Sequence, residues 1–168
     1  MKTLLIFRHG KAEERAPGGD RDRALTPRGE RDVVRVAHHL AANAGMPDSI
    51  ITSDARRAYQ TATIAAETIG FPGTVPAEPR LYNAGEDALV QLVHALPDTA
   101  DTVVLVGHNP GFERLGNRLV AADTPIQELP TAGLIHLEFD VAHWQDVQAG
   151  TGRLRGVYTP RQPAEEAT

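Results

Sequence analysis

The chain has 168 residues, a length typical of one domain, and its 41% hydrophobic and 23% charged residues argue against intrinsic disorder and a coiled coil. The formal net charge of −5 argues against a general nucleic-acid binder, which usually carries a basic excess. The chain contains no cysteine, which excludes disulfides, iron–sulfur clusters, thiolate zinc sites and a cysteine nucleophile. We expect a single domain over residues 1–158 and a disordered tail over residues 159–168.

The first apolar run covers residues 3–7 and stops at Arg8 and His9. It is too short for the hydrophobic region of a signal peptide, and we interpret it as a buried strand. No run approaches the roughly 18 apolar residues of a membrane span. The sequence therefore predicts a cytoplasmic protein without membrane contact.

Short, apolar, β-branched runs predict further buried strands at residues 49–52 and 102–106. Helical patterns alternate with these strands and cover residues 26–44, 55–69, 86–96 and 110–121. Near the end, residues 133–139 and 143–147 partly alternate between polar and apolar, which predicts an antiparallel hairpin at the edge of the sheet. This order of elements is typical of an α/β layer fold.

Residues 12–24 predict a surface loop directly after the first strand, because they combine proline and glycines with a dense mixture of Asp, Glu and Arg. Two interpretations stay open for this loop. It is either a solvated connection or a lid that contacts substrate.

Three polar clusters fall where predicted strands end, at residues 8–11, 53–57 and 107–111. In open α/β sheets, ligands bind beyond the carboxyl ends of the strands. Two histidines and several cations therefore converge at one edge of the sheet without an accompanying set of carboxylates. The sequence predicts an anion site there, and it indicates neither a metal nor a cofactor.

Phosphate fits this site best, because the guanidinium group offers a planar fork of donors that matches phosphate oxygens. The Asn109-Pro110 junction begins a predicted helix whose free N–H groups and dipole also favour an anion. Gly10 allows the backbone to approach a ligand closely.

Four motifs in this order resemble the histidine phosphatase superfamily, which has the phosphoglycerate-mutase-like fold. They lie at residues 8–10, 25–29, 53–62 and 107–110. The small size and the short connection between Leu81 and Glu86 resemble its SixA-type phosphohistidine phosphatase branch. The resemblance implies a three-layer α/β/α sandwich with a mostly parallel central sheet and antiparallel edge strands.

The resemblance also implies catalytic roles. His9 would be the nucleophile that accepts the phosphoryl group, Arg8 and Arg57 would hold phosphate oxygens, and His108 would complete the pocket. Further phosphate-binding or supporting positions beside these residues are Gly10, Lys11, Ser53 and Asn109.

Elementary chemistry supports these roles. A histidine must be neutral to attack, and nearby arginines repel the proton that would block it. The same arginines neutralise the phosphoryl oxygens. A covalent phosphohistidine then splits hydrolysis into two easier steps.

One departure from the family concerns the general acid. Larger members use Glu or Asp to protonate the leaving group, and here Glu86 or Asp87 is the candidate, with an ordinary helix N-terminal acid as the other interpretation. A protonated phosphohistidine imidazole departs without such an acid, whereas an alkoxide does not. The sequence therefore favours a labile phosphate as substrate.

We expect a metal-independent phosphatase that acts through phosphohistidine on His9, with protein phosphohistidine as the substrate and a phosphoprotein as the partner. The alternatives are a phosphatase of a small phosphorylated metabolite and a non-catalytic module that binds phosphate or phosphoprotein. A nucleic-acid partner is disfavoured because aromatic residues are only 5% of the chain. The oligomeric state stays open, and a monomer is compatible with the sequence.

Overall fold

The computed structural model describes residues 1–161 and contains one five-stranded sheet with strand order β2-β3-β1-β4-β5. The strands are β1 (Lys2–Arg8), β2 (Ser49–Thr52), β3 (Thr102–Gly107), β4 (Leu134–Phe139) and β5 (Arg153–Tyr158). The helices are α1 (Pro27–Ala44), α2 (Arg56–Ile69), α3 (Glu86–His94) and α4 (Gly111–Leu119).

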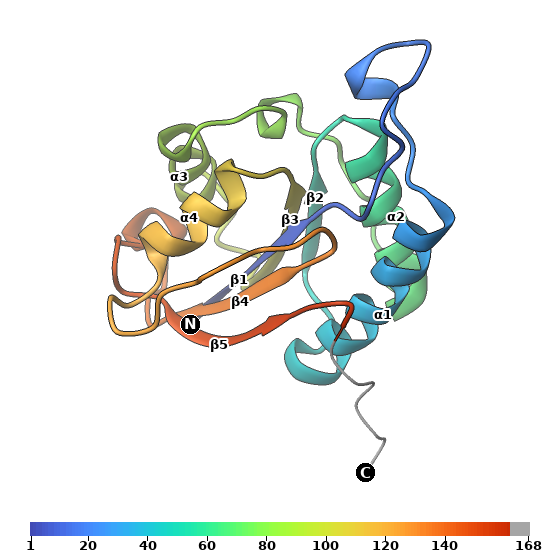
Figure 1. The fold of residues 1–168 in the computed structure, drawn as a ribbon. Coiled ribbons are helices and arrows are strands. Elements are labelled where there is room, and N and C mark those ends of the chain that lie inside the picture. The colour runs from blue at the N-terminus through green and yellow to red at the C-terminus, as the bar shows by residue number, and fades with distance from the viewer. Residues whose placement is uncertain (162–168) are drawn as a thin grey trace.

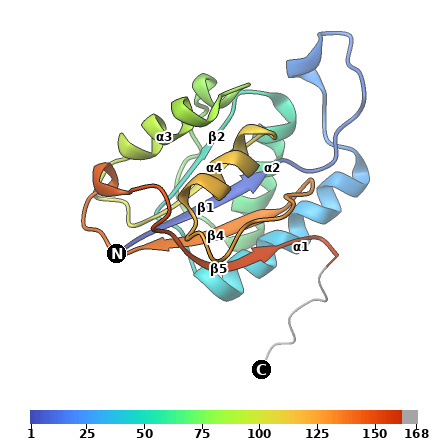
Figure 2. The same cartoon turned by 60° about the vertical axis from the view of Figure 1, so that its left-hand side comes forward.

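The sheet combines a parallel part with an antiparallel edge. β3 pairs in parallel with both β1 and β2, whereas β4 runs antiparallel to β1 and β5 runs antiparallel to β4. Helices cover both faces: α1 and α2 lie on one side of the sheet, and α3 and α4 lie on the other (Figures 1 and 2). The predicted α/β sandwich with a parallel centre and antiparallel edge strands is confirmed.

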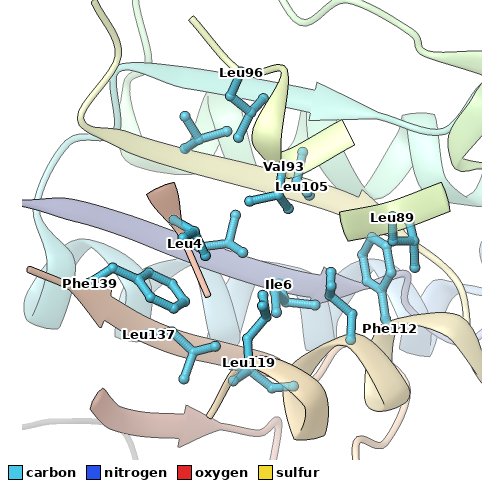
Figure 3. Packing of buried hydrophobic residues seen from close by; sticks show 14 of the residues in the cluster. Leu4, Ile6, Leu89, Val93, Leu96, Leu105, Phe112, Leu119, Leu137 and Phe139 are labelled. Atoms are coloured by element: carbon cyan, nitrogen blue, oxygen red, sulfur yellow. The ribbon is translucent and has the colours of Figure 1, made fainter. Parts of the chain in front are cut away.

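The central strands are buried on both faces, which explains why their sequences are apolar without alternation. In β1, Leu4 and Ile6 join the core beneath α3 and α4, whereas Leu5 and Phe7 join the core beneath α1 and α2. Figure 3 shows the first of these cores, in which Leu4 and Ile6 lie among side chains of α3, α4 and β4. Two fully packed cores thus fix the strand ends that carry the polar clusters.

The helix boundaries follow the local signals in the sequence. The Thr26 side chain accepts a hydrogen bond from the backbone N–H of Gly29 and caps α1, which begins at Pro27. α2 ends at Gly70, whose φ of 73° is the left-handed conformation that glycine adopts without strain.

The prediction of a strand at residues 143–147 is wrong. This segment contains the short 3-10 helix Trp144–Asp146, and the partner of β4 is β5. The apolar residues that suggested a strand belong to the core: the Trp144 ring is fully buried, and its indole N–H donates to the carbonyl of Ala100 over 2.8 Å. Its backbone N–H is held by the Asp98 carboxylate, also over 2.8 Å.

Within residues 1–161, no helix is both long enough and apolar enough to cross a membrane. The predicted disordered tail lies outside the described residues from position 162 onward. Residues 12–24 form a surface loop that includes the 3-10 helix Asp20–Asp22. In Figure 1 this blue loop rises from the end of β1 beside the start of α2.

Candidate active site

An open pocket of about 300 Å³ lies at the carboxyl ends of the parallel strands. It is lined by Arg8, His9, Lys11, Ala12, Arg23, Arg57, Asn83, His108, Asn109 and Thr131. Six residues singled out in the sequence therefore meet here, drawn from β1, the first turn of α2 and the segment after β3. Gly10, Ser53 and Glu86 are not part of the lining.

The His9 ring is held in one orientation. Its Nδ1 lies 2.7 Å from the carbonyl oxygen of Gly10, so Nδ1 carries the proton and donates, which leaves the lone pair on Nε2. The backbone N–H of His9 donates to Gly107 on β3 over 3.0 Å. Burial lowers the pKa of His9 to about 3 despite the bond to Gly10, and the positive charges of Arg57 and Arg8 act in the same direction. The imidazole is therefore neutral at pH 7 and able to act as a nucleophile.

The His108 ring is fixed by a serine from the neighbouring strand end. Its Nε2 lies 2.8 Å from Oγ of the fully buried Ser53. That Oγ also accepts the backbone N–H of Ala55 over 3.2 Å, so the hydroxyl proton is free to go to His108 Nε2. His108 Nε2 therefore accepts this hydrogen bond, and the His108 ring carries its own proton on Nδ1. Burial lowers the pKa of His108 to about 4, and the positive charge of Arg57 is the second cause of this shift.

Three buried donors in the pocket have no hydrogen-bond partner among residues 1–161: Arg8 Nε, Arg57 Nε and His108 Nδ1. In both arginines, other nitrogens of the guanidinium form hydrogen bonds that fix the side chain. Arg8 donates from Nη1 to the carbonyl of Leu129 over 2.9 Å, and Arg57 donates to Asp20. Buried donors without partners are rare in folded proteins. Three of them beside one cationic pocket have the chemistry that suits an oxyanion.

Asn109, a predicted supporting residue that lines the pocket, also holds neighbouring backbone in place. Asn109 accepts the backbone N–H of Glu113 over 3.1 Å and donates to Leu129 over 3.0 Å, so it caps α4 and holds the neighbouring loop. The backbone N–H of Phe112 is also taken, by the carbonyl of His108. Two of the helix N–H groups expected to be free for an anion, those of Phe112 and Glu113, therefore already have partners within the protein.

Gly10 is required for packing against α1. A Cβ at this position would lie 2.9 Å from both the Gly29 carbonyl oxygen and a methyl group of Val33. Its backbone N–H donates to Thr61 Oγ1 on α2 over 3.0 Å. Gly10 thus joins the end of β1 to two helices.

The two candidate acids lie on α3 and both pair with Arg118 of α4. Glu86 is 3.5 Å from Arg118 Nη1, and Asp87 shares the same nitrogen. Neither residue lines the pocket. The structure therefore does not bring Glu86 to the reacting centre.

Sequence reasoning left two interpretations open for the loop at residues 12–24 and singled out none of its residues. Arg23 lines the pocket, and Asp20 binds both terminal nitrogens of Arg57. Tyr82 was also missed; its ring meets the His108 ring edge-on with centroids 5.5 Å apart. Alternating charges in a loop resemble a solvated surface, so nothing in the sequence distinguishes Asp20 from its acidic neighbours.

Comparisons with known proteins agree with this geometry. A sequence model of the histidine phosphatase superfamily (branch 1) matches residues 4–85. An uncharacterised protein of Mycobacterium tuberculosis is 32% identical over 163 residues, which cover 92% of this chain and all of that protein. The chain belongs to the histidine phosphatase superfamily. It is accordingly a phosphatase, and the predicted family is confirmed.

Solved structures of this superfamily add a resemblance to its SixA branch. The chain matches a provisionally assigned phosphohistidine phosphatase SixA from Nakamurella multipartita with a TM-score of 0.80 and 28% identity, over 96% of this chain and 97% of that one. A second provisionally assigned SixA, from Agrobacterium tumefaciens, gives a TM-score of 0.79 and 28% identity over 95% and 98%. The histidine phosphatase fold thus spans nearly the whole chain.

Within residues 1–161, the structure contains no group of three His, Cys, Asp or Glu side chains that could hold a metal ion. Positive charge in the pocket comes instead from side chains of the protein, namely Arg8, Lys11, Arg23 and Arg57.

Proposed function

We propose that this histidine phosphatase hydrolyses protein phosphohistidine through a covalent phosphohistidine on His9. The observation that carries the proposal is the set of unpartnered donors around a neutral histidine: Arg8 Nε, Arg57 Nε and His108 Nδ1 all lack partners among the described residues. A phosphoryl group offers these donors three oxygens while its phosphorus faces the nucleophile.

In the first step, His9 Nε2 attacks phosphorus. The new N–P bond forms as the P–N bond of the substrate breaks, and the electron pair of that bond stays on the substrate imidazole. The two arginines and His108 Nδ1–H stabilise the charge on the phosphoryl oxygens during transfer. Because His9 Nδ1 keeps its proton, the phosphorylated ring becomes an imidazolium, and its bond to the Gly10 carbonyl gains strength as that charge develops.

The second step releases phosphate. A water oxygen attacks phosphorus, the bond from Nε2 to phosphorus breaks, and the electron pair returns to His9. Both water protons leave with dihydrogen phosphate, so the neutral imidazole is regenerated. Charge neutralisation rests on arginines, and we expect turnover to continue in EDTA.

The choice of substrate follows from the leaving group. The residues that line the pocket include no carboxylic acid. The Asp20 carboxylate binds the lining residue Arg57, and the hydrogen bond from Tyr82, followed by that from Arg57, lowers the pKa of Asp20 to about 2. It is ionised at neutral pH and cannot donate a proton. A phosphohistidine whose imidazole is already protonated needs no donor, whereas an alkyl phosphate does.

The test compares kcat/KM for three substrates in the presence of EDTA: a phosphohistidine protein, a sugar phosphate and p-nitrophenyl phosphate. We expect phosphohistidine and the activated nitrophenyl ester to be hydrolysed and the sugar phosphate to be poor. His9→Ala should abolish all turnover. A strong preference for the sugar phosphate would instead favour a metabolite phosphatase, and binding without turnover would favour a non-catalytic module.

A phosphoprotein is the partner that this proposal implies. The pocket is open, so the phosphorylated side chain of a folded protein can enter it. A cytoplasmic location and a single domain over residues 1–158 remain predictions from the sequence.

A further inference from the structure

Arg57 is held at both terminal nitrogens by one residue. Its Nη1 donates to the backbone carbonyl of Asp20 over 2.7 Å, and its Nη2 donates to the Asp20 carboxylate over 3.1 Å. The Arg57 residue is 5% exposed, whereas the Asp20 side chain is half exposed. A loop residue thus covers the outer edge of a buried arginine.

This contact occupies one edge of the guanidinium and leaves another edge without a partner. Asp20 accepts one N–H from Nη1 and one from Nη2, at the end of the guanidinium. The donors that remain free lie along its side, and they include the unpartnered Nε–H. Nε–H and the second N–H of Nη2 form a parallel pair, which is the fork that binds two oxygens of a phosphate.

Asp20 is itself fixed from two other directions. Arg23 Nε donates to its carboxylate over 3.0 Å, and the Tyr82 hydroxyl donates to it from the segment before α3. The Tyr82 ring is covered by the Arg21 guanidinium, whose central carbon lies 4.2 Å from the ring centroid, and its edge contacts His108. Asp20 therefore connects the loop, Arg57 and the His108 side of the pocket.

The same 3-10 helix provides a natural comparison. Asp22 lies two residues after Asp20, but its carboxylate pairs with Arg56 at 3.7 Å, and both side chains are about half exposed. Exposed pairs of this kind contribute little. The 3-10 helix thus carries one carboxylate bound to the buried Arg57 and one paired with the exposed Arg56.

We propose that Asp20 is a positioning residue that acts through Arg57, holding the Nε edge of its guanidinium toward the phosphoryl group. The inference rests on the proposed phosphatase site but not on the identity of its substrate. An opposite role is conceivable for a carboxylate beside a phosphate site: it could compete with phosphate for Arg57. The two roles predict changes of opposite sign in anion affinity.

The first experiment measures the binding of inorganic phosphate by calorimetry. Asp20→Ala should weaken phosphate binding roughly tenfold, because a charge-assisted hydrogen bond that orients a donor is lost. Asp20→Asn keeps an oxygen that can accept from Arg57 and should lose less. Asp22→Ala is the matched control and should bind like the wild type. Unchanged or tighter binding by Asp20→Ala would overturn the proposal.

The second experiment shows whether Asp20 acts through Arg57. In the Arg57→Ala background, Asp20→Ala should cause no further loss of phosphate affinity, because the group that it positions is gone. Equal losses in both backgrounds would contradict a positioning role. Thermal melting of every variant verifies folding, and phosphate binding needs no turnover, so a failed substrate assignment would leave this test intact.

Discussion

The floor and the rim of the pocket are built differently. The floor consists of Arg8, His9, Arg57 and His108, with Ser53 behind His108, and these residues lie at or just after strand ends or begin α2 beside the two packed cores. The rim consists of half-buried and exposed loop side chains held by ion pairs, such as Arg23 with Asp20. Exposed ion pairs contribute about 0–1 kcal/mol each to stability, whereas a disturbance of core packing costs several kcal/mol. The chemistry is therefore expected to be rigid at the floor and tunable at the rim.

Two adjacent arginines test this division most strongly. Arg57→Ala removes a buried phosphate donor, and kcat/KM should fall about 10²–10³-fold. Arg56→Ala removes an exposed partner of Asp22 and should change kcat/KM less than about twofold. Steady-state rates on p-nitrophenyl phosphate measure both. Equal effects of the two substitutions would erase the distinction between floor and rim.

Ser53 sharpens the comparison, because it belongs to the floor without lining the pocket. Ser53→Ala removes the hydroxyl that fixes the His108 tautomer, so kcat should fall about tenfold while KM changes little. Ser49→Ala, at the start of the preceding strand β2, serves as the control. An unchanged kcat in Ser53→Ala would show that His108 needs no such support.

The buried histidines of the floor should also make folding sensitive to acid. The folded-state pKa is about 3 for His9 and about 4 for His108, both lowered from 6.5 chiefly by burial. The unfolded chain binds more protons below pH 6.5, so the stability present above that pH is lost as the pH falls to about 4 for His108 and to about 3 for His9. Each group changes the unfolding free energy by up to about 1.4 kcal/mol per pH unit.

Urea denaturation at pH 7, 5.5 and 4 measures this loss. A double variant, His9→Ala with His108→Ala, should show a shallower decline than the wild type. Some decline will remain, because burial also lowers the pKa of His136. Parallel curves for the two proteins would contradict the lowered pKa values of the pocket histidines.

Glu86 gives the smallest expected effect. It pairs with Arg118 outside the pocket, so Glu86→Gln should leave phosphohistidine hydrolysis within about twofold of the wild type. Rates at several pH values would reveal a hidden role as an acid. A large loss confined to low pH, where the carboxyl group would hold its proton, would restore Glu86 as the proton donor.

The floor could be predicted from the sequence because local signals encode it. Apolar runs mark β1, β2 and β3, and the polar clusters after them must meet at one edge of a parallel sheet. Thr26 with Pro27 marks the start of α1, and glycines mark the helix ends. The wrong strand at residues 143–147 has a physical cause: Trp144 and Val147 are apolar because they seal the core.

The rim could not be predicted, because its contacts join residues far apart in the chain. Asp20 lies 37 positions from Arg57 and 62 positions from Tyr82. Its neighbours Arg21, Asp22 and Arg23 carry the same kinds of charge, so composition alone cannot say which carboxylate turns inward. Tyr82 shows no periodicity that would connect it to His108.

Direct detection of the phosphorylated enzyme tests the central claim. The protein is mixed briefly with radiolabelled substrate, quenched in alkali, digested, and the labelled peptide is sequenced by mass spectrometry. We predict a phosphate on His9 that is stable in base and labile in acid, and that is absent in His9→Ala. Turnover by the wild type with no label on His9, or with the label on another residue, would contradict the mechanism.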